Sequence, residues 1–232
     1  MFRFLWLGQG GYAFTNGRKT IFLDPYFSNP LGPTRMMLPP ADPQTVHPNA
    51  IITTHDHDDH LDPGYIQSLD KTGVTFFGPD SCLRHLVQLG VDQAQTVPFH
   101  RGDTKVFDSV SLSAVYARHT EDSIGVILEC AGKRAHVTGD TEFDDRLGQG
   151  IIGIDIMFCC INGKWGNMNA DEAVKTALRV QPRLVVPMHY GMFVENTVDP
   201  QPFVEKARAA GLQCKTHEPG VWYDVEEFVS LV

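Results

Sequence analysis

The chain has 232 residues, of which 42% are hydrophobic and 20% are charged. This composition is typical of one compact domain covering residues 1–232, with two small domains as the alternative. The formal net charge of -9 disfavours nucleic acid as a partner, because non-specific binding requires Lys and Arg to neutralise phosphates. No apolar run reaches membrane-spanning length, so no membrane partner is expected.

The five cysteines are odd in number and contain no C-x-x-C pair, which indicates neither a disulfide framework nor a thiolate metal site. The apolar N-terminus is short and lacks a signal-peptide pattern. Both features predict a protein of the reducing cytoplasm. A homo-oligomer is possible, because the sequence contains no feature that indicates the oligomeric state.

The chain begins with a strand pattern. Residues 2–7 are mostly apolar, and the runs 12–15 and 20–23 flank Asn16-Gly17, which favours a tight hairpin turn. Asp24 closes the third of these antiparallel strands; its local sequence favours a turn former, and support of a metal ligand is the alternative. Residues 29–48 are rich in Pro and predict a long loop, in which Arg35 either meets an anionic substrate or is solvated.

The rest of the chain alternates strand and helix patterns without a linker or repeat. Helices are expected at 63–69, at 80–89 with Asp80 as N-cap, after Asn169 as N-cap, and at 202–210. Strands are expected at 50–54, 74–77, 104–107, 110–116, 124–129, 135–138, 155–161, 184–186 and 221–223. Strands that precede a mixed strand and helix region favour an α+β fold with two sheets packed face to face and helices outside.

The most informative stretch is His55-Asp56-His57-Asp58-Asp59-His60, which follows the apolar run 50–54. Imidazoles and carboxylates are good ligands for divalent ions, and without an ion the crowded carboxylates repel each other. If the stretch is extended, His55, His57 and Asp59 face a common point while His60 faces elsewhere. The alternative is a solvated acidic turn with incidental histidines.

Three later residues of ligand type each follow a predicted strand: His119, Asp140 and His189. Taken singly, each histidine has an ordinary explanation as a hydrogen-bonded residue, and Asp140 as a turn cap. Strand ends can converge on one edge of a sheet, so together with the His-rich stretch they predict a metal site.

In their order and spacing, H-x-H-x-D-H at 55–60, His119, the Gly-Asp at Asp140 and the late His189 resemble the metallo-β-lactamase superfamily over nearly the whole chain. The resemblance implies a four-layer αβ/βα sandwich with a two-metal site at the edge between the sheets. It implies that one ion is held by His55, His57 and His119, that the other is held by Asp59, His60 and His189, and that Asp140 bridges them. Asp24 also matches a family position near the metals, which implies a supporting role. One or two divalent ions are expected per chain, Mn or Zn first and Fe as the alternative.

Within the superfamily, the segments 118–125, 138–141, 168–173 and 187–191 look most like the branch of L-ascorbate-6-phosphate lactonases. The expected activity is hydrolysis of a lactone or phosphoester of a small phosphorylated metabolite by metal-activated water. Asp59 would orient the water and accept its proton, with Asp140 between the ions, and Tyr190 would donate to a developing oxyanion. The candidates for contact with an anionic substrate are Arg35, Arg118, and the Gly-rich loop 162–167 with Lys164 and Trp165. The alternatives are solvated side chains, or a core-filling role for Trp165.

Three other functions stay open: an iron-dependent oxidoreductase of the same fold, a phosphodiesterase acting on nucleotides or lipids, and a non-catalytic metal sensor. The resemblance disfavours the first, because diiron members similar to flavodiiron proteins have Glu where His57 stands, and single-iron dioxygenases do not use the second ligand set. Catalysis is favoured over sensing, because a ligand set with room for water is typical of catalytic sites.

Overall fold

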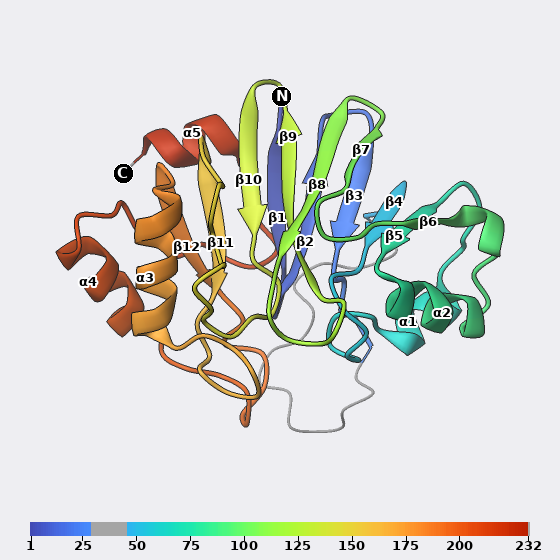
Figure 1. Cartoon of the computed structure of the whole chain (residues 1–232). Helices are drawn as coiled ribbons and strands as arrows, with labels where there is room; N and C mark the ends of the chain where they lie inside the picture. Colours follow the sequence, from blue (N-terminus) through green and yellow to red (C-terminus); the bar gives the residue numbers. More distant parts are fainter. Residues whose placement is uncertain (29–45, 232) are drawn as a thin grey trace.

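Two β-sheets packed face to face form the centre of the molecule in the computed structural model, which describes residues 1–28 and 46–231 (Figure 1). In this described part, the first sheet has the order β13 (Trp222–Asp224), β1 (Arg3–Gly8), β2 (Gly11–Thr15), β3 (Thr20–Leu23), β4 (Ala50–Ile52), β5 (Thr75–Gly78), β6 (Thr96–Pro98). The second has the order β12 (Leu184–Met188), β11 (Ile156–Cys160), β10 (Lys133–Val137), β9 (Ile124–Cys130), β8 (Val110–Tyr116), β7 (Thr104–Phe107). Each sheet is therefore part parallel and part antiparallel.

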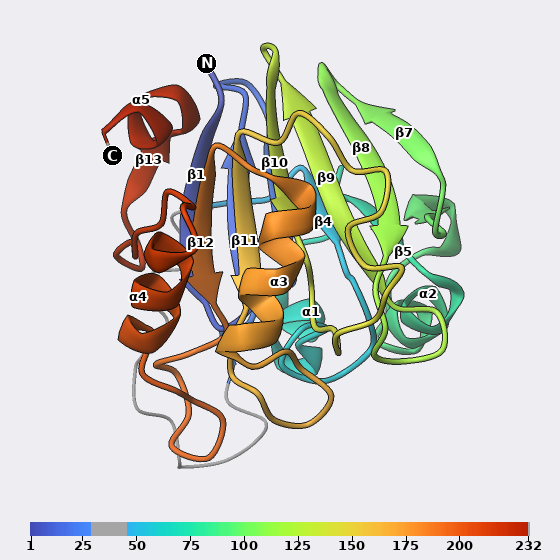
Figure 2. The same cartoon turned by 60° about the vertical axis from the view of Figure 1, so that its left-hand side comes forward.

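Helices lie on the outer faces of both sheets (Figure 2). On one side are α1 (Pro63–Ser68) and α2 (Asp80–Gln88), and α2 contacts β5 and β6. On the other side are α3 (Ala170–Val180), which contacts β11, and α4 (Gln201–Ala209), which packs on α3; α5 (Val225–Ser230) follows β13. The layers are those of the expected αβ/βα sandwich. Within the described residues, no helix has both the length and the apolar character needed to cross a membrane.

The strand β1 illustrates why the central strands read as continuous apolar runs. Phe4 and Trp6 point into the core between the two sheets, whereas Leu5 and Leu7 belong to the second core that α1 and α2 cover. A strand that is buried on both faces needs apolar residues at every position rather than at alternate ones.

Several local predictions differ from the structure. Asp80 was expected to cap α2, but the residue before the helix is Pro79, no side chain caps it, and Asp80 instead accepts a hydrogen bond from His100 Nε2 at 3.0 Å. This prediction was wrong, although an acid in the first turn still favours the helix dipole. The sequence analysis also missed β6 and α5, because elements of three and six residues are too short to show a period. Most of the predicted loop 29–48 lies outside the described residues.

The N-terminus of α3 gives a first test of stability. Asn169 accepts hydrogen bonds from the backbone of Asp171 and Glu172, and Glu172 accepts one from the Asn169 backbone, which completes a capping box. We expect Asn169→Ala to lower the free energy of unfolding by about 1 kcal/mol and Tm by roughly 2–4 °C, measured by circular dichroism. Glu205→Ala, at an exposed site on α4, should leave Tm nearly unchanged, and an equal loss there would contradict the capping argument.

Candidate metal centre

Residues of ligand type gather where several strands end. Asp24 follows β3, His55 lies shortly after β4, His119 after β8, Asp140 after β10 and His189 directly after β12. These strands come from both sheets, so the residues meet only if the two sheet edges are held together.

Two backbone hydrogen bonds join the edges at this place. Ile124 N donates to Thr54 O at 3.0 Å, which links the start of β9 to the segment after β4. His189 N donates to Gln9 O at 3.0 Å, which links the end of β12 to the turn between β1 and β2. Thr54 and Gln9 belong to the first sheet's connections, and Ile124 and His189 to the second's, so the site lies at the seam between the sheets.

The His-rich stretch is turned rather than extended, and the expectation of a single extended segment was wrong. His60 N and Leu61 N both donate to His57 O, at 2.9 and 2.8 Å. Directly afterwards, Asp62 caps α1 by accepting from Tyr65 N. The turn brings His60 back beside His55, with ring centroids 4.2 Å apart, so one short segment supplies two neighbouring donor groups.

The first donor group consists of three imidazoles. His55 Nε2 and His119 Nε2 each lie 3.1 Å from His57 Nδ1, and the three nitrogens form one of the candidate metal-binding sets. Nitrogens bound to a tetrahedral divalent ion at 2.0–2.1 Å are separated by about 3.3 Å. Both observed distances are therefore close to the separation that such an ion needs.

For His55 and His119, hydrogen bonds fix which ring nitrogen faces the centre of the first donor group. Thr54 Oγ1 donates to Asp24 and therefore accepts from His55 Nδ1 at 3.1 Å, and His119 Nδ1 donates to Gly166 O at 3.0 Å. Both rings thus turn an unprotonated Nε2 toward the centre. Gly166 is required here, since an added Cβ would lie 2.9 Å from His119 Nδ1.

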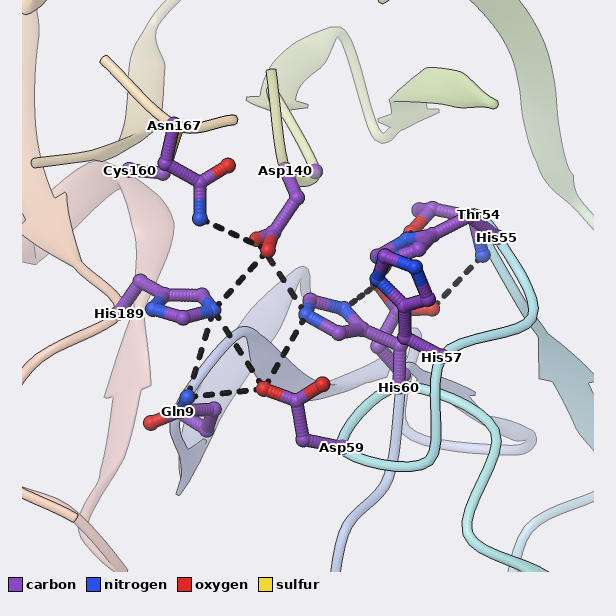
Figure 3. A network of polar contacts seen from close by, with 12 residues as sticks. Gln9, Thr54, His55, His57, Asp59, His60, Asp140, Cys160, Asn167 and His189 are labelled. Carbon is purple, nitrogen blue, oxygen red and sulfur yellow. Dashed lines mark hydrogen bonds and ion pairs between the residues drawn. The ribbon is translucent and has the colours of Figure 1, made fainter. Parts of the chain in front are cut away.

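The second donor group combines two imidazoles with a carboxylate (Figure 3). Asp59 Oδ2 lies 3.8 Å from His60 Nε2 and 3.7 Å from His189 Nε2. Asp140 lies between the two groups: its Oδ1 is 3.3 Å from His60 Nε2, and its Oδ2 is 3.1 Å from His189 Nε2 and 3.8 Å from His119 Nε2.

Two buried atoms in this centre support its fit to metal ions. His60 Nε2 and Asp140 Oδ1 face each other at 3.3 Å as an ion pair, but neither makes a hydrogen bond of good geometry with a described residue. Buried polar atoms in that state are costly unless something else binds them. Imidazole nitrogens and carboxylate oxygens suit Mn²⁺, Zn²⁺ and Fe²⁺ alike. The donor set therefore fits one or two divalent ions without selecting among these metals.

The electrostatics of the centre also favour cations. Burial lowers the pKa of His55 well below its usual value, which keeps the ring in the neutral form that can bind a metal. Burial would also lower the pKa of His60, but the carboxylates of Asp140, Asp59 and Asp24 outweigh it and raise that pKa well above the usual value. A buried position surrounded by three acids is one where positive charge is stabilised.

Asp24 supports the second donor group. Its carboxylate accepts from Thr54 N at 2.7 Å, Thr54 Oγ1 at 2.6 Å and His60 Nδ1 at 2.8 Å, so it fixes the His60 ring with Nε2 toward Asp140. Of the two interpretations of Asp24, the structure therefore favours the support of a metal-binding residue over a turn former.

We expect Asp24→Asn to weaken metal binding by about tenfold or more, the usual cost of losing a partner behind a metal ligand. The amide can no longer accept all three hydrogen bonds, so the orientation of His60 is released. Titration of the metal-free variant with Zn²⁺ in the presence of a competing chelator measures the effect. Asp70→Asn, an exposed acid that caps a turn at Thr72, is the control; unchanged affinity in Asp24→Asn would contradict the role of Asp24.

A pocket of about 590 Å³ opens over both donor groups. It is lined by Asp56, His57, Asp58, Asp59, His119, Asp140, Trp165, Asn167, Phe193, Glu195 and Asn196. The predicted Trp165 is among these residues, and Arg35 lies outside the described part of the chain.

The other predicted substrate contacts lie away from this pocket. Arg118 forms ion pairs with Glu142 at 3.3 Å and Asp144 at 3.7 Å, and it lines a separate hollow. Lys164 Nζ donates to the backbone carbonyl of Glu195 at 2.9 Å, which ties two loops of the pocket wall together. Tyr190 packs its ring on Trp6 at 5.1 Å. The structure therefore does not bring Arg118, Lys164 or Tyr190 to the lining of the pocket.

Two contributors, Gln9 and Thr54, were missed by the sequence analysis, and a third, Asn167, was predicted only as part of a substrate loop. Gln9 Nε2 donates to Asp59 Oδ2 at 2.9 Å, and Asn167 Nδ2 donates to Asp140 Oδ2 at 2.8 Å (Figure 3). Thr54 connects Asp24 to His55 through its hydroxyl group. A polar residue inside Gly8-Gln9-Gly10-Gly11 was a usable signal, because it interrupts a turn otherwise made of glycine. Thr54 carried no local signal, since only long-range contacts give it a role, whereas Asn167 lies in the Gly-rich loop 162–167 that was a candidate for contact with the substrate and instead donates to Asp140.

Comparison with known proteins agrees with this geometry. The family model described as "Beta-lactamase superfamily domain" matches residues 19–190. A metal-dependent hydrolase of Pyrobaculum islandicum is 30% identical over 210 residues, covering 88% of this chain and 91% of the relative.

Two solved structures share the fold. Igni18, a metallo hydrolase of the archaeon Ignicoccus hospitalis, superposes with a TM-score of 0.79 at 23% identity, covering 96% of this chain and 98% of its own. A putative metal-dependent hydrolase of Parabacteroides distasonis gives a TM-score of 0.76 at 23% identity, covering 94% and 93%. With the αβ/βα sandwich and the His and Asp groups at its seam, these matches show that the chain belongs to the metallo-β-lactamase superfamily.

Proposed function

We propose that this protein is a metal-dependent hydrolase that cleaves a lactone or related ester of a small molecule. The observation that carries the proposal is Asp140, whose carboxylate faces His60 and His189 of the second donor group and lies 3.8 Å from His119 Nε2 of the first. A carboxylate in that position is suited to two ions held side by side, and the names of the relatives support a hydrolase.

When bound, such ions would supply Lewis acidity and make a water molecule acidic enough to attack near neutral pH. The protein contributes the positions of the donors and a base. Asp59 lines the pocket, and its Oδ2 is held by Gln9, so this carboxylate is placed to orient the attacking water and to take up its proton. Trp165 and Phe193 offer apolar walls for the rest of the substrate.

The charge of the pocket favours a lactone over a phosphoester. Besides Asp59 and Asp140, the lining includes Asp56, Asp58 and Glu195, and none of its described residues is Lys or Arg. A phosphate group would therefore depend on the ions and on residues such as Arg35 that lie outside the described part. We accordingly rank an anionic, phosphorylated substrate below an uncharged lactone.

The test is a substrate panel with metal-free protein that has been reloaded with Mn²⁺ or Zn²⁺. We expect turnover of lactones, with uncharged lactones cleaved faster than phosphorylated ones and than nucleotide or lipid phosphodiesters. If no member of the panel is hydrolysed while tightly bound iron and oxygen consumption are found, the oxidoreductase alternative replaces this proposal. Metal binding with neither activity favours a sensor.

The five cysteines support the proposal that the enzyme works in a reducing cytoplasm. All five are buried and none forms a disulfide. Burial raises the pKa of Cys160 and Cys214 to about 12, so these thiols are held in their unreactive protonated form.

A further inference from the structure

Gln9 occupies an unusual backbone position in the turn between β1 and β2. Its φ is +51°, in the left-handed region where a glycine would be free of strain. Two hydrogen bonds fix the backbone there, since Gln9 O accepts from Trp6 Nε1 at 3.1 Å and from His189 N at 3.0 Å. A turn that already contains three glycines thus has one residue with a side chain, Gln9, in a strained backbone conformation. Backbone strain of this kind persists mainly at functional positions.

The side chain of Gln9 points into the second donor group (Figure 3). The residue is fully buried, and its Nε2 lies 2.9 Å from Asp59 Oδ2 and 3.3 Å from His189 Nε2. The neighbouring Gly10 packs so closely on His60 that an added Cβ would lie 2.7 Å from His60 Cε1. The turn therefore forms the wall of the group made by Asp59, His60 and His189.

The amide of Gln9 is only half satisfied. Its oxygen, Oε1, is buried and makes no hydrogen bond with the described residues, although a buried amide oxygen normally has a partner. Its nitrogen faces the two atoms, Asp59 Oδ2 and His189 Nε2, whose lone pairs an ion would take. A donor group directed at a bound cation would be repelled by it, whereas the amide oxygen would be attracted.

We propose that the side-chain carbonyl of Gln9 is a further ligand of the ion held by Asp59, His60 and His189, an inference that rests on the metal centre of the proposed function. Rotation about the last side-chain torsion exchanges the oxygen and nitrogen of the amide with little change in shape. Amide oxygens are ligands of hard divalent ions. The interaction gives the buried Oε1 a partner and gives up the hydrogen bond from Nε2 to Asp59 Oδ2, so in the metal-bound form the ion rather than Gln9 would hold Asp59. It also explains why a strained position carries glutamine rather than glycine.

The test compares two variants by metal affinity. Gln9→Met keeps the length of the side chain but removes both polar atoms, and Gln9→Glu keeps an oxygen ligand but loses the donor. Each metal-free protein is titrated with Mn²⁺ against a competing chelator, and bound metal is counted by mass spectrometry. We expect Gln9→Met to lower the affinity for one of the two ions by about ten- to a hundredfold and to leave the affinity for the other unchanged. Gln9→Glu should bind both ions at least as tightly as the wild type.

Gln95→Met is the matched control, because Gln95 also donates its amide to backbone carbonyls, those of Lys71 and Val74, but lies outside the metal centre. Wild-type affinity for both ions in Gln9→Met would overturn the inference. Equal weakening in Gln9→Met and Gln9→Glu would also overturn it, since Gln9 would then act only as a donor that positions Asp59.

These outcomes separate the inference from the proposed function. If the wild type binds two ions but hydrolyses nothing, the proposed hydrolase activity fails and the affinities of the variants still decide the role of Gln9. If the wild type binds no ion, both fail together.

Discussion

Replacement of Asp140 by Asn is expected to lower kcat of the metal-loaded enzyme by roughly a thousandfold, equivalent to about 4 kcal/mol of barrier. The carboxylate is buried beside His60 and His189, and these ion pairs outweigh burial and hold the pKa of Asp140 well below its usual value. Removal of one partner from a buried charged cluster commonly lowers the free energy of unfolding by about 3–5 kcal/mol, so the fold of the variant is checked beside its turnover. The amide keeps the volume of the side chain but loses the charge that faces both donor groups.

The measurement is turnover on the best lactone of the panel, with far-ultraviolet circular dichroism to verify the fold. Asp145→Asn is the control, because the Asp145 carboxylate is 95% exposed and lies on the surface beside Arg179. Turnover of Asp140→Asn within a few fold of the wild type would rule out a place for Asp140 between two ions.

Removal of metal should abolish hydrolysis and reduce stability in parallel. Ligand that binds only the folded state at a hundred times its Kd adds about 2.7 kcal/mol to the free energy of unfolding. For a chain of this length that corresponds to a Tm increase of roughly 5–10 °C. The physical origin of the effect is the crowding of acids and imidazoles in the two donor groups, of which His55, His60 and His189 are buried, because bound cations would offset the negative charge of the crowded carboxylates.

The experiment is thermal unfolding of protein stripped by a chelator, before and after addition of Mn²⁺ or Zn²⁺. The double variant His55→Ala and His119→Ala, which removes two of the three nitrogens of the first group, should lose most of the added stability. A Tm that is independent of metal in the wild type, with full activity after chelation, would show that hydrolysis needs no metal.

Much of the fold was predictable because its signals are local. Apolar runs such as 155–161 and 184–186 identify strands buried on both faces, and Asn169 with Glu172 marks the start of a helix. The short elements β6 and α5 were not predictable, since their few residues show no period. The orientation of the His-rich stretch was also misjudged, because backbone hydrogen bonds to His57 O turn it and no pattern of residue types reveals them.

The sequence by itself determined the kinds of donor and their positions at strand ends, because residue type sets the affinity for metals and local apolar runs set the strands. The tertiary structure decided which metal-binding side chains meet and which ring nitrogens face inward. It also decided which Arg and Lys side chains are bound to other groups and so lie away from the pocket. Arg118 and Lys164 are engaged by Glu142 and by the Glu195 backbone, whereas Gln9 reaches Asp59 from a turn 50 residues earlier. The physical reason is that these arrangements depend on hydrogen bonds between distant segments, which form only when the two sheets pack face to face and their strand ends meet at the seam.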